Sequence, residues 1–293
     1  AGGLGEGEFM QPEAIDLDRS GNLYIAESRA RKVIVFDAEG RFVREWGVDY
    51  QPRGIAVSAG SIYVLGEGAV YVYTTTGAET LRFGTRGAEP GQIDAYLGIE
   101  VDRGTIYVAD SFNRRIQAFD RTGELLWARP ESATPRSVEM TPSAEPTGGL
   151  SADDTPFAWD LPQDIVIDGA GRLVVVDAFR YEIVVLDPVS GEVLGTHGGF
   201  GRNDGLFNRP TSIDYDAERD WFVIADTDNA RVQIVRIPGS GATALAGIRR
   251  MADSPARWLV PSLIFLAIVL VVSLVQWRRT AVINRLPDAV GGE

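Results

Sequence analysis

One pattern of residues recurs five times along the chain and constrains the fold more than any single residue does. Its clearest copy has three segments, Ile99–Asp102, Thr105–Asp110 and Arg115–Asp120, followed by a glycine turn at Gly123. The second segment ends in an acid, and the third begins five positions later with a basic residue. The other copies cover residues 15–40, 55–77, 165–191 and 213–237. An internal repeat of this kind predicts a row of similar structural units.

The period and the composition of the repeat indicate a β-propeller. Pro12 and Pro52, which open two successive copies, are 40 residues apart, the length of one four-stranded blade. The segments are short apolar runs such as Leu173–Val176, bounded by Gly, Asp and Asn, which is typical of strands buried on both faces. We therefore expect an all-β propeller over residues 1–246, with five visible blades.

Several phrases of the repeat resemble the NHL repeat, whose usual pattern is GxF, xxP, xGIAVD, GNIYVAD and N-RIQVF-G. They are Gly5–Pro12, Asn22–Glu27, Ile106–Asn113 and Gly205–Pro210. The resemblance covers roughly residues 5–246 and implies a propeller of the six-bladed, TolB-like class. It leaves function open, because NHL propellers include scaffolds, sensors, nucleic-acid binders and a few enzymes. Because a closed ring removes exposed sheet edges, we expect six blades in the complete protein, of which five are visible here.

Opposite charges five positions apart span the turn between the second and third strands of three copies. The pairs are Glu27 with Lys32, Asp110 with Arg115, and Asp226 with Arg231. We interpret them as structural clamps, because opposite charges can face each other across a hairpin. The fourth copy has Asp177 but Glu182 at the basic position, and the second copy has lost both partners in Gly66–Gly68. We expect those two blades to be the less regular ones.

Three acids in first strands form a candidate metal site. Asp16, Glu100 and Asp214 follow the recurrent Ile directly, at the position where the NHL repeat usually has Ala. Because a first strand lines the channel of a propeller, the three carboxylates could gather a cation such as Ca²⁺ or a basic ligand. They could equally pair with Arg53 or with neighbouring groups and be structural. Since sugar-lactonase propellers bind calcium through carboxylates and an Asn, a metal-dependent hydrolase is an alternative function.

The sequence offers no other catalytic set. It contains no cysteine and one histidine, His197. Peptidylglycine amidating lyases resemble NHL propellers and use a histidine-rich zinc site, which a single histidine cannot form. There is no Ser-His-acid set with spare histidines and no phosphate-binding glycine loop. We therefore expect no catalytic residues and no organic cofactor, and a binding or scaffold role is favoured.

The charge of the chain argues against nucleic-acid binding. The formal net charge is −13, although residues 247–293 hold six arginines against three acids. The acidic excess therefore lies in the propeller. Affinity for nucleic acid depends largely on Lys and Arg neutralising phosphates, so we expect no nucleic-acid partner.

An uncharged apolar segment follows the propeller. As a helix, the 20 residues of 258–277 would be about 30 Å long, which matches the hydrocarbon core of a bilayer. Trp258 and Trp277 at its ends, with Arg278 and Arg279 just beyond, suit the two interfaces. The positive-inside rule gives a tie, with three arginines on each flank, but the Arg278-Arg279 pair abuts the span. We therefore favour a propeller outside the cytoplasm.

These observations divide the chain and leave three functions open. The predicted parts are the propeller (1–246), which contains a Pro-rich insertion (130–156), a juxtamembrane linker (247–257), a transmembrane helix (258–277) and a short tail (278–293). The insertion is expected to be a solvated loop or a docking segment. The leading function is a single-pass, membrane-anchored propeller that binds a protein, peptide or glycan as a scaffold or sensor. The alternatives are the metal-dependent hydrolase and a structural subunit of a larger membrane complex.

Overall fold

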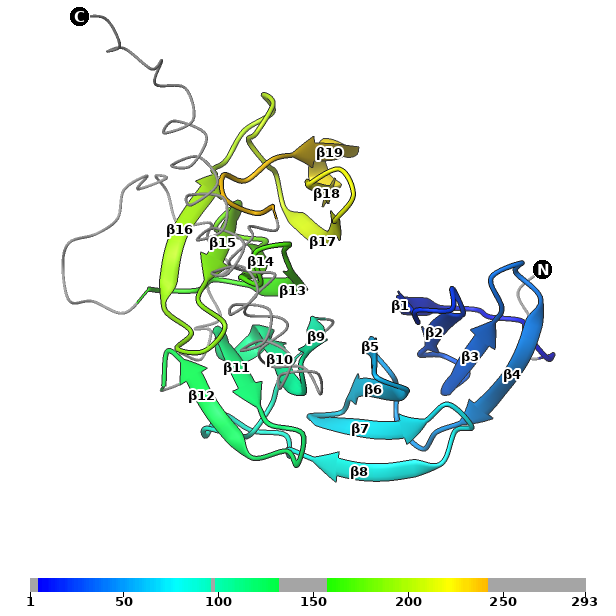
Figure 1. Ribbon diagram of the computed structural model, residues 1–293. Coiled ribbons are helices and arrows are strands. Elements are labelled where there is room, and N and C mark those ends of the chain that lie inside the picture. Colours follow the sequence, from blue (N-terminus) through cyan, green and yellow to red (C-terminus); the bar gives the residue numbers. More distant parts are fainter. Residues whose placement is uncertain (1–4, 96–97, 132–156, 242–293) are drawn as a thin grey trace, which may run out of the picture. The chain divides into compact units, whose positions relative to one another are not determined.

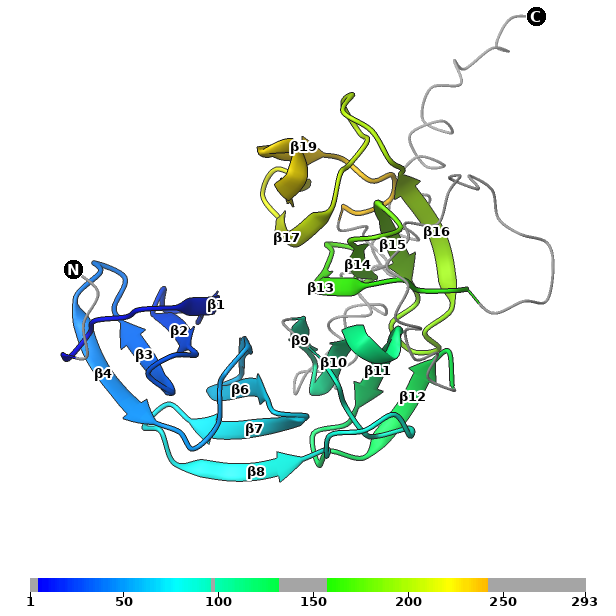
Figure 2. The same ribbon diagram turned by 180° about the vertical axis from the view of Figure 1, so that it is seen from behind.

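The computed structural model describes residues 5–95, 98–131 and 157–241 (Figures 1 and 2). These residues belong to one compact unit, Ala1–Gly241, and a second unit comprises Ala242–Glu293. The predicted linker, span and tail lie outside the described residues, as do Trp258, Trp277, Arg278, Arg279 and most of the insertion. Within the described ranges, no helix is long and apolar enough to cross a membrane.

The described residues form five antiparallel sheets, called blades 1 to 5 in chain order. Blade 1 contains β1 (Pro12–Leu17), β2 (Leu23–Glu27), β3 (Lys32–Phe36) and β4 (Phe42–Gly47). Blade 2 contains β5 (Gly54–Ser58), β6 (Ser61–Gly66), β7 (Ala69–Thr74) and β8 (Glu79–Phe83). Blade 3 contains β9 (Ile99–Asp102), β10 (Thr105–Asp110), β11 (Arg115–Phe119) and β12 (Leu125–Arg129). Blade 4 contains β13 (Pro162–Ile167), β14 (Leu173–Asp177), β15 (Glu182–Leu186) and β16 (Val193–Gly198). Blade 5 contains β17 (Pro210–Asp216), β18 (Trp221–Asp226) and β19 (Arg231–Val235).

Within each sheet the strands follow chain order, so each strand pairs with its neighbours in sequence from the same blade (Figure 1). This confirms the predicted all-β propeller with five blades. The expectation that blades 2 and 4 are less regular is wrong for strand pairing, since both are complete four-stranded sheets. Blade 5 has three strands within the described ranges. The ladder is made by backbone groups and apolar contacts, so it does not depend on the charged pair at the turn.

The apolar core lies between consecutive blades rather than inside any one of them. Tyr24 and Val33 of blade 1 pack in one buried cluster with Ile55 and Val64 of blade 2. Three further clusters join blades 2 and 3, blades 3 and 4, and blades 4 and 5 in the same way. Because strand side chains alternate between two faces, an apolar residue at nearly every position lets each sheet bury both faces.

The first strands of consecutive blades lie next to one another. β1 contacts β5, β5 contacts β9, β9 contacts β13, and β13 contacts β17. Each first strand is also the edge of its own sheet, as Figure 2 shows for β13 and β17. Side chains at corresponding positions of first strands therefore come close in space although they lie 40 or more residues apart in sequence.

Candidate functional site

The first-strand acid Asp16 joins two blades. Its carboxylate accepts hydrogen bonds from the backbone N–H of Leu17 (2.7 Å) and from that of Val57 on β5 of the next blade (2.6 Å). Arg53, which the sequence offered as a structural partner, lies 2.9 Å from Glu13. Because a first strand is an edge strand, its outward N–H groups need partners from outside the sheet. Asp16 supplies such a partner to blade 2.

Asp164 does the same between blades 4 and 5, and sequence reasoning missed it. Its carboxylate accepts from the N–H of Ile213 (3.0 Å) and from the hydroxyl of Ser212 (2.7 Å). Asp164 stands two positions before Val166, the residue that corresponds to Asp16. Residues two apart on a strand share a face, so comparing faces rather than aligned positions could have found it.

Glu100 and Asp214 complete a group of four first-strand acids. Burial and the charges of Asp16 and Asp164 raise the pKa of Glu100 to about 8. Burial also raises the pKa of Asp16 and of Asp164, against their backbone hydrogen bonds, and the charge of Asp214 adds to both increases. Asp214 itself accepts from the N–H of Tyr215 (2.7 Å). The four carboxyl groups therefore lie within electrostatic reach of one another.

The four first-strand carboxyl groups are not arranged as a metal site in the part of the chain that the structure describes. Among the residues that the structure describes, no three His, Cys, Asp or Glu side chains are arranged to hold a metal ion. Asp16 and Asp164 already use their oxygens on N–H and O–H groups. Binding of Ca²⁺ by Asp16, Glu100 and Asp214 stays a prediction, and it would need those carboxylates to turn from their present partners.

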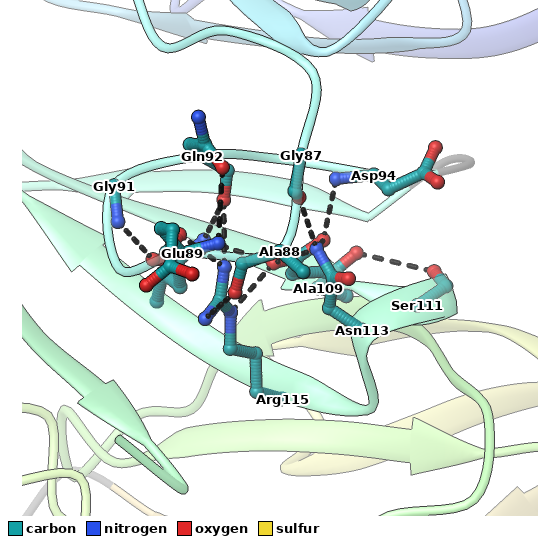
Figure 3. Close-up of polar contacts among 12 residues, drawn as sticks. Gly87, Ala88, Glu89, Gly91, Gln92, Asp94, Ala109, Ser111, Asn113 and Arg115 are labelled. Carbon is teal, nitrogen blue, oxygen red and sulfur yellow. Dashed lines mark hydrogen bonds and ion pairs between the residues drawn. The ribbon is translucent and has the colours of Figure 1, made fainter. Parts of the chain in front are cut away.

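The clamp of blade 3 is a buried ion pair that fastens the linker between blades 2 and 3 (Figure 3). Arg115 Nε lies 2.7 Å from Asp110 Oδ2, and both side chains are fully buried. The remaining guanidinium N–H groups of Arg115 donate to the carbonyls of Ala88 (2.9 Å), Glu89 (2.8 Å) and Gln92 (2.8 Å). The other oxygen of Asp110 accepts from the N–H of the linker residue Asp94 at 2.7 Å. The predicted clamp is confirmed, and its main contacts are with the linker.

Blade 5 repeats this arrangement. Arg231 lies 2.8 Å from Asp226 and donates to the carbonyls of Asn203 and Leu206, both at 2.9 Å. Asp226 in turn accepts from the N–H of Asn208 at 2.7 Å. The second predicted clamp is therefore also confirmed, and it fastens the linker between blades 4 and 5.

In blade 1 the two clamp residues act separately. Glu27 and Lys32 are opposite each other in the β2–β3 ladder. Lys32 Nζ nevertheless lies 2.8 Å from Glu45 of β4 and donates to the carbonyl of Gly5 at 3.3 Å. Glu27 accepts from the N–H groups of Met10, Gln11 and Ala30. The interpretation of Glu27 and Lys32 as a mutual ion pair needs correcting, because both longer side chains reach past each other to the linker and to β4.

Blade 4 fastens its linker with a guanidinium from another position. Asp177 accepts from the N–H groups of Asp160 (2.7 Å) and Leu161 (2.8 Å). Arg180, rather than residue 182, donates to the linker carbonyl of Ala158 and pairs with Glu182, both at 3.0 Å. Sequence reasoning missed Arg180. The signal was present, since an arginine stands two residues before the acid that breaks the pattern.

Blade 2 has an aromatic plug in place of a clamp. Gly66 stands where blade 3 has Asp110, and a Cβ there would lie 2.4 Å from the ring of Tyr50. Tyr50 is buried, stacks on Tyr71 with 3.7 Å between ring centroids, and shares a 3.0 Å hydrogen bond with the hydroxyl of Tyr73. Glycine is therefore required at this position because the ring of Tyr50 fills the space of a side chain.

The clamp of blade 3 also fixes an exposed aromatic residue. Phe112 lies in the single-turn 3₁₀ helix η1 (Ser111–Asn113) and is 45% exposed. Its N–H donates to the carbonyl of Asp94 at 3.0 Å, and Asn113 Nδ2 donates to that of Gly87 at 2.7 Å. The next residue, Arg114, forms an ion pair with Asp160 of the neighbouring linker. The side of the sheets that carries the linkers and these turns, called the linker face below, thus presents Phe112 from a fixed backbone.

Comparison with known proteins adds a family to this geometry. A family model described as outer membrane protein assembly factor BamB matches residues 29–204. The chain belongs to this family. NHL repeat-containing protein 3 of Homo sapiens is 25% identical over 246 residues, which are 76% of this chain and 64% of that protein. The chain thus spans less than two thirds of the length of this curated relative.

Solved structures agree on the fold of this family member. An auxiliary nutrient binding protein from Bacteroides ovatus is 20% identical with a TM-score of 0.56, over 78% of this chain and 59% of that one. A streptogramin B lyase structure is 16% identical with a TM-score of 0.54, over 78% and 69%. At this level of identity the likeness shows the fold alone. The chain is a β-propeller with NHL repeat-containing homologues, as the sequence resemblance implied.

Proposed function

We propose that this propeller is a binding module that takes a protein or peptide on its linker face, as a scaffold or sensor. In this proposal the propeller has six blades, residues 258–277 anchor it in a membrane, and it lies outside the cytoplasm. The observation that carries the proposal is Phe112, which is 45% exposed on a turn whose backbone is fixed by the buried clamp.

The surroundings of Phe112 suit a protein partner better than a small molecule. Arg114, two residues after Phe112, pairs with Asp160, and Asp94, whose carbonyl accepts from the N–H of Phe112, lies 3.3 Å from Arg86. An aromatic anchor surrounded by charged groups is the usual arrangement of a protein interface, with an apolar centre and a polar rim. Because the turn is already ordered, binding would cost little conformational entropy of its backbone.

The fold itself does not decide between binding and catalysis. A nutrient binding protein and a lyase both share it. A metal-dependent hydrolase or lactonase therefore stays the second candidate. It is favoured by the four first-strand acids, of which Glu100 has a pKa of about 8. A bound cation would favour the ionised form of all four carboxyl groups and lower that pKa.

Photo-crosslinking tests the binding proposal. A photoreactive phenylalanine analogue in place of Phe112, in the full-length protein in its own membranes, should form a discrete adduct. The matched control is the same analogue at Val189, which is 82% exposed in the turn between β15 and β16, at the opposite end of the strands. With the captured partner purified, Phe112→Ala should weaken its binding at least tenfold, and Val189→Ala should not. The same adducts at both positions, or none at position 112, would contradict the proposal.

The membrane anchor has its own test. Deleting residues 258–277 should move the protein from the membrane fraction to the soluble fraction without unfolding the propeller. The removal of Arg278 and Arg279 alone should leave it in the membrane, because the apolar segment supplies most of the affinity. A deletion variant that stays with the membrane would rule the anchor out.

A further inference from the structure

The linker that leads into blade 5 presents an aromatic residue of its own on the linker face. Phe200 lies in this linker, between β16 and β17, and is 60% exposed. Its ring packs edge-on against the ring of Tyr181, with 4.9 Å between the centroids. Tyr181 belongs to the turn between β14 and β15 of blade 4 and is half-buried. Two aromatic rings from consecutive parts of the fold therefore meet, and most of Phe200 stays open to solvent.

The backbone next to Phe200 is fixed by hydrogen bonds. The N–H of Gly201 donates to the carbonyl of Phe207 at 3.0 Å. The carbonyl of Gly201 accepts from Asn229 Nδ2 at 2.8 Å, the contact that Asn113 makes in blade 3 (Figure 3). The clamp of blade 5 holds two further carbonyls of this linker. Binding at Phe200 would therefore cost little conformational entropy of the backbone.

The linker into blade 3 shows what the fold requires at this position. Arg86 forms an isolated bridge with Ile93, and Phe200 forms the same bridge with Phe207, so Arg86 and Phe200 occupy corresponding places. Arg86 lies 3.3 Å from Asp94, so its charge is matched within its own linker. The path of the linker therefore does not depend on an aromatic ring at this position. A binding role accounts for an exposed ring that the fold does not need.

The same linker carries an unmatched positive charge. Arg202 is exposed, and its guanidinium has no ion pair or hydrogen bond with any residue that the structure describes. The nearby carboxylate of Asp204 lies 3.8 Å from Arg231, so it already has a counter-ion. A single free guanidinium in an acidic propeller suits a carboxylate of a partner better than the many phosphates of a nucleic acid.

Interacting side chains connect Phe200 with Phe112 across blade 4. Arg114, two residues after Phe112, forms an ion pair with Asp160. Burial raises the pKa of Tyr181, and the charge of Asp160 adds to the increase, so the Tyr181 hydroxyl lies within electrostatic reach of that carboxylate. Tyr181 in turn packs on Phe200. The two exposed rings therefore belong to one surface that extends from the turn of blade 3 to the linker into blade 5.

We propose that Phe200, Tyr181 and Arg202 form a second contact site for the protein partner of the linker face, and that the bound segment carries an apolar side chain beside an acidic one. The apolar side chain packs on the ring of Phe200, and the carboxylate pairs with Arg202. This inference rests on the proposed function in one respect, since it takes the partner to be a protein. It adds the place and the chemistry of the contacted segment.

Photo-crosslinking locates the segment. A photoreactive phenylalanine analogue is placed at position 200, and separately at position 112, in the full-length protein in its own membranes. The matched control is position 42, because Phe42 is also an exposed phenylalanine but lies on the outer strand β4. Mass spectrometry then identifies the crosslinked residues. We expect position 200 to capture the same protein as position 112, and position 42 not to capture it.

The captured segment, made as a synthetic peptide, tests the chemistry. Phe200→Ala and Arg202→Glu should each weaken its binding at least about tenfold. Arg121→Glu, a change at an exposed arginine in the turn between β11 and β12, should have no effect. Exchanging the acid of the peptide for Lys should weaken binding to the wild type and restore binding to Arg202→Glu. All three variants should keep the melting temperature of the wild type, because the altered side chains are exposed.

The outcomes separate this inference from the proposed function. Capture at position 112 without capture at position 200 would overturn the inference and leave the proposed function standing. Capture at position 200 of a lipid, a glycan, a second copy of this chain or an unrelated protein would also overturn it, as would peptide binding that is indifferent to Arg202→Glu. Capture at position 200 alone, by a segment that passes the charge exchange, would support the site and count against the role of Phe112.

Discussion

Blades 3 and 4 fasten their linkers to the same effect with different residues. In blade 3 a fully buried Arg115 contacts both Asp110 and three linker carbonyls. In blade 4 the acid Asp177 is held by backbone N–H groups, and a partly exposed Arg180 pairs with Glu182 instead. Both blades thus need a carboxylate for linker N–H groups and a guanidinium for linker carbonyls. The position that supplies each group can change.

The largest loss of stability is expected for Arg115→Met, which removes the guanidinium of the blade 3 clamp. The change leaves Asp110 buried without its counter-ion and removes the guanidinium donors of the Ala88, Glu89 and Gln92 carbonyls, so unfolding should become easier by about 3–5 kcal/mol. Urea unfolding monitored by tryptophan fluorescence measures it. The control is Arg41→Met, which removes an exposed ion pair with Asp37 and should change stability by less than about 0.5 kcal/mol. Equal effects of the two changes would show that the clamp of blade 3 is no stronger than a surface pair.

The second test uses the first strands, where blade 3 has Glu100 and blade 4 has Val166. The pKa of Glu100 is about 8 in the folded protein and near 4.5 when the chain is unfolded. Between these values the folded state holds a proton that the unfolded state has lost. Stability therefore falls as the pH rises from about 4.5 to 8, by at most about 1.4 kcal/mol per pH unit from this group.

Glu100→Gln should remove this part of the pH dependence. The measurement is urea unfolding of the wild type and the variant across pH 5 to 8.5, and the difference between the two slopes isolates Glu100 from the other titrating groups. Glu100→Val, which copies blade 4, should reduce the pH dependence of stability by the same amount. Parallel curves for wild type and both variants would mean that Glu100 titrates normally.

A smaller effect is expected for Arg180→Ala. Arg180 is partly exposed, pairs with Glu182 and lies 4.5 Å above the ring of Phe157, so its loss should lower stability by about 1 kcal/mol. The backbone donors of Asp177 are unaffected. The comparison between the blades would fail if Arg180→Ala proved as destabilising as Arg115→Met in the same urea assay.

The smallest expected effect concerns calcium. If Asp16, Glu100 and Asp214 bind Ca²⁺, the wild type should gain about 0.4 kcal/mol when free calcium equals the Kd. Replacing all three acids with Ala should abolish the gain, and Glu39→Ala, at an exposed acid, should not. Thermal unfolding with calcium, magnesium and a chelator provides the measurement. A wild-type protein whose melting temperature is indifferent to divalent ions would exclude the site.

The strands could be predicted well from the sequence because the same pattern occurs in five copies. It also located the clamps of blades 3 and 5, since an acid and an arginine five positions apart face each other across the hairpin. It could not tell that Lys32 pairs with Glu45, because two acids were within reach of a long side chain and only packing selects between them.

The contacts between first strands were beyond sequence reasoning for a different reason. Asp16 meets Val57, and Asp164 meets Ile213, across more than 40 residues. Their partners are backbone N–H groups, which every residue except proline carries and which leave no mark in the sequence. The prediction that blades 2 and 4 are less regular went wrong because the strand ladders do not depend on the charged pair. At the linker, Tyr50 stands in place of the pair in blade 2, and Arg180 in blade 4.

Each clamp fastens the linker that leads into its own blade, not the one that leaves it. A blade and its preceding linker, together called a cassette here, are therefore held to each other by their own polar contacts, while the apolar clusters join each cassette to the next. The boundary between cassettes lies just after an outer strand. The 132–156 segment falls there, after β12 and before the linker residues held by Asp177 and Arg180. The chain has lengthened at the one kind of position where no cassette is interrupted.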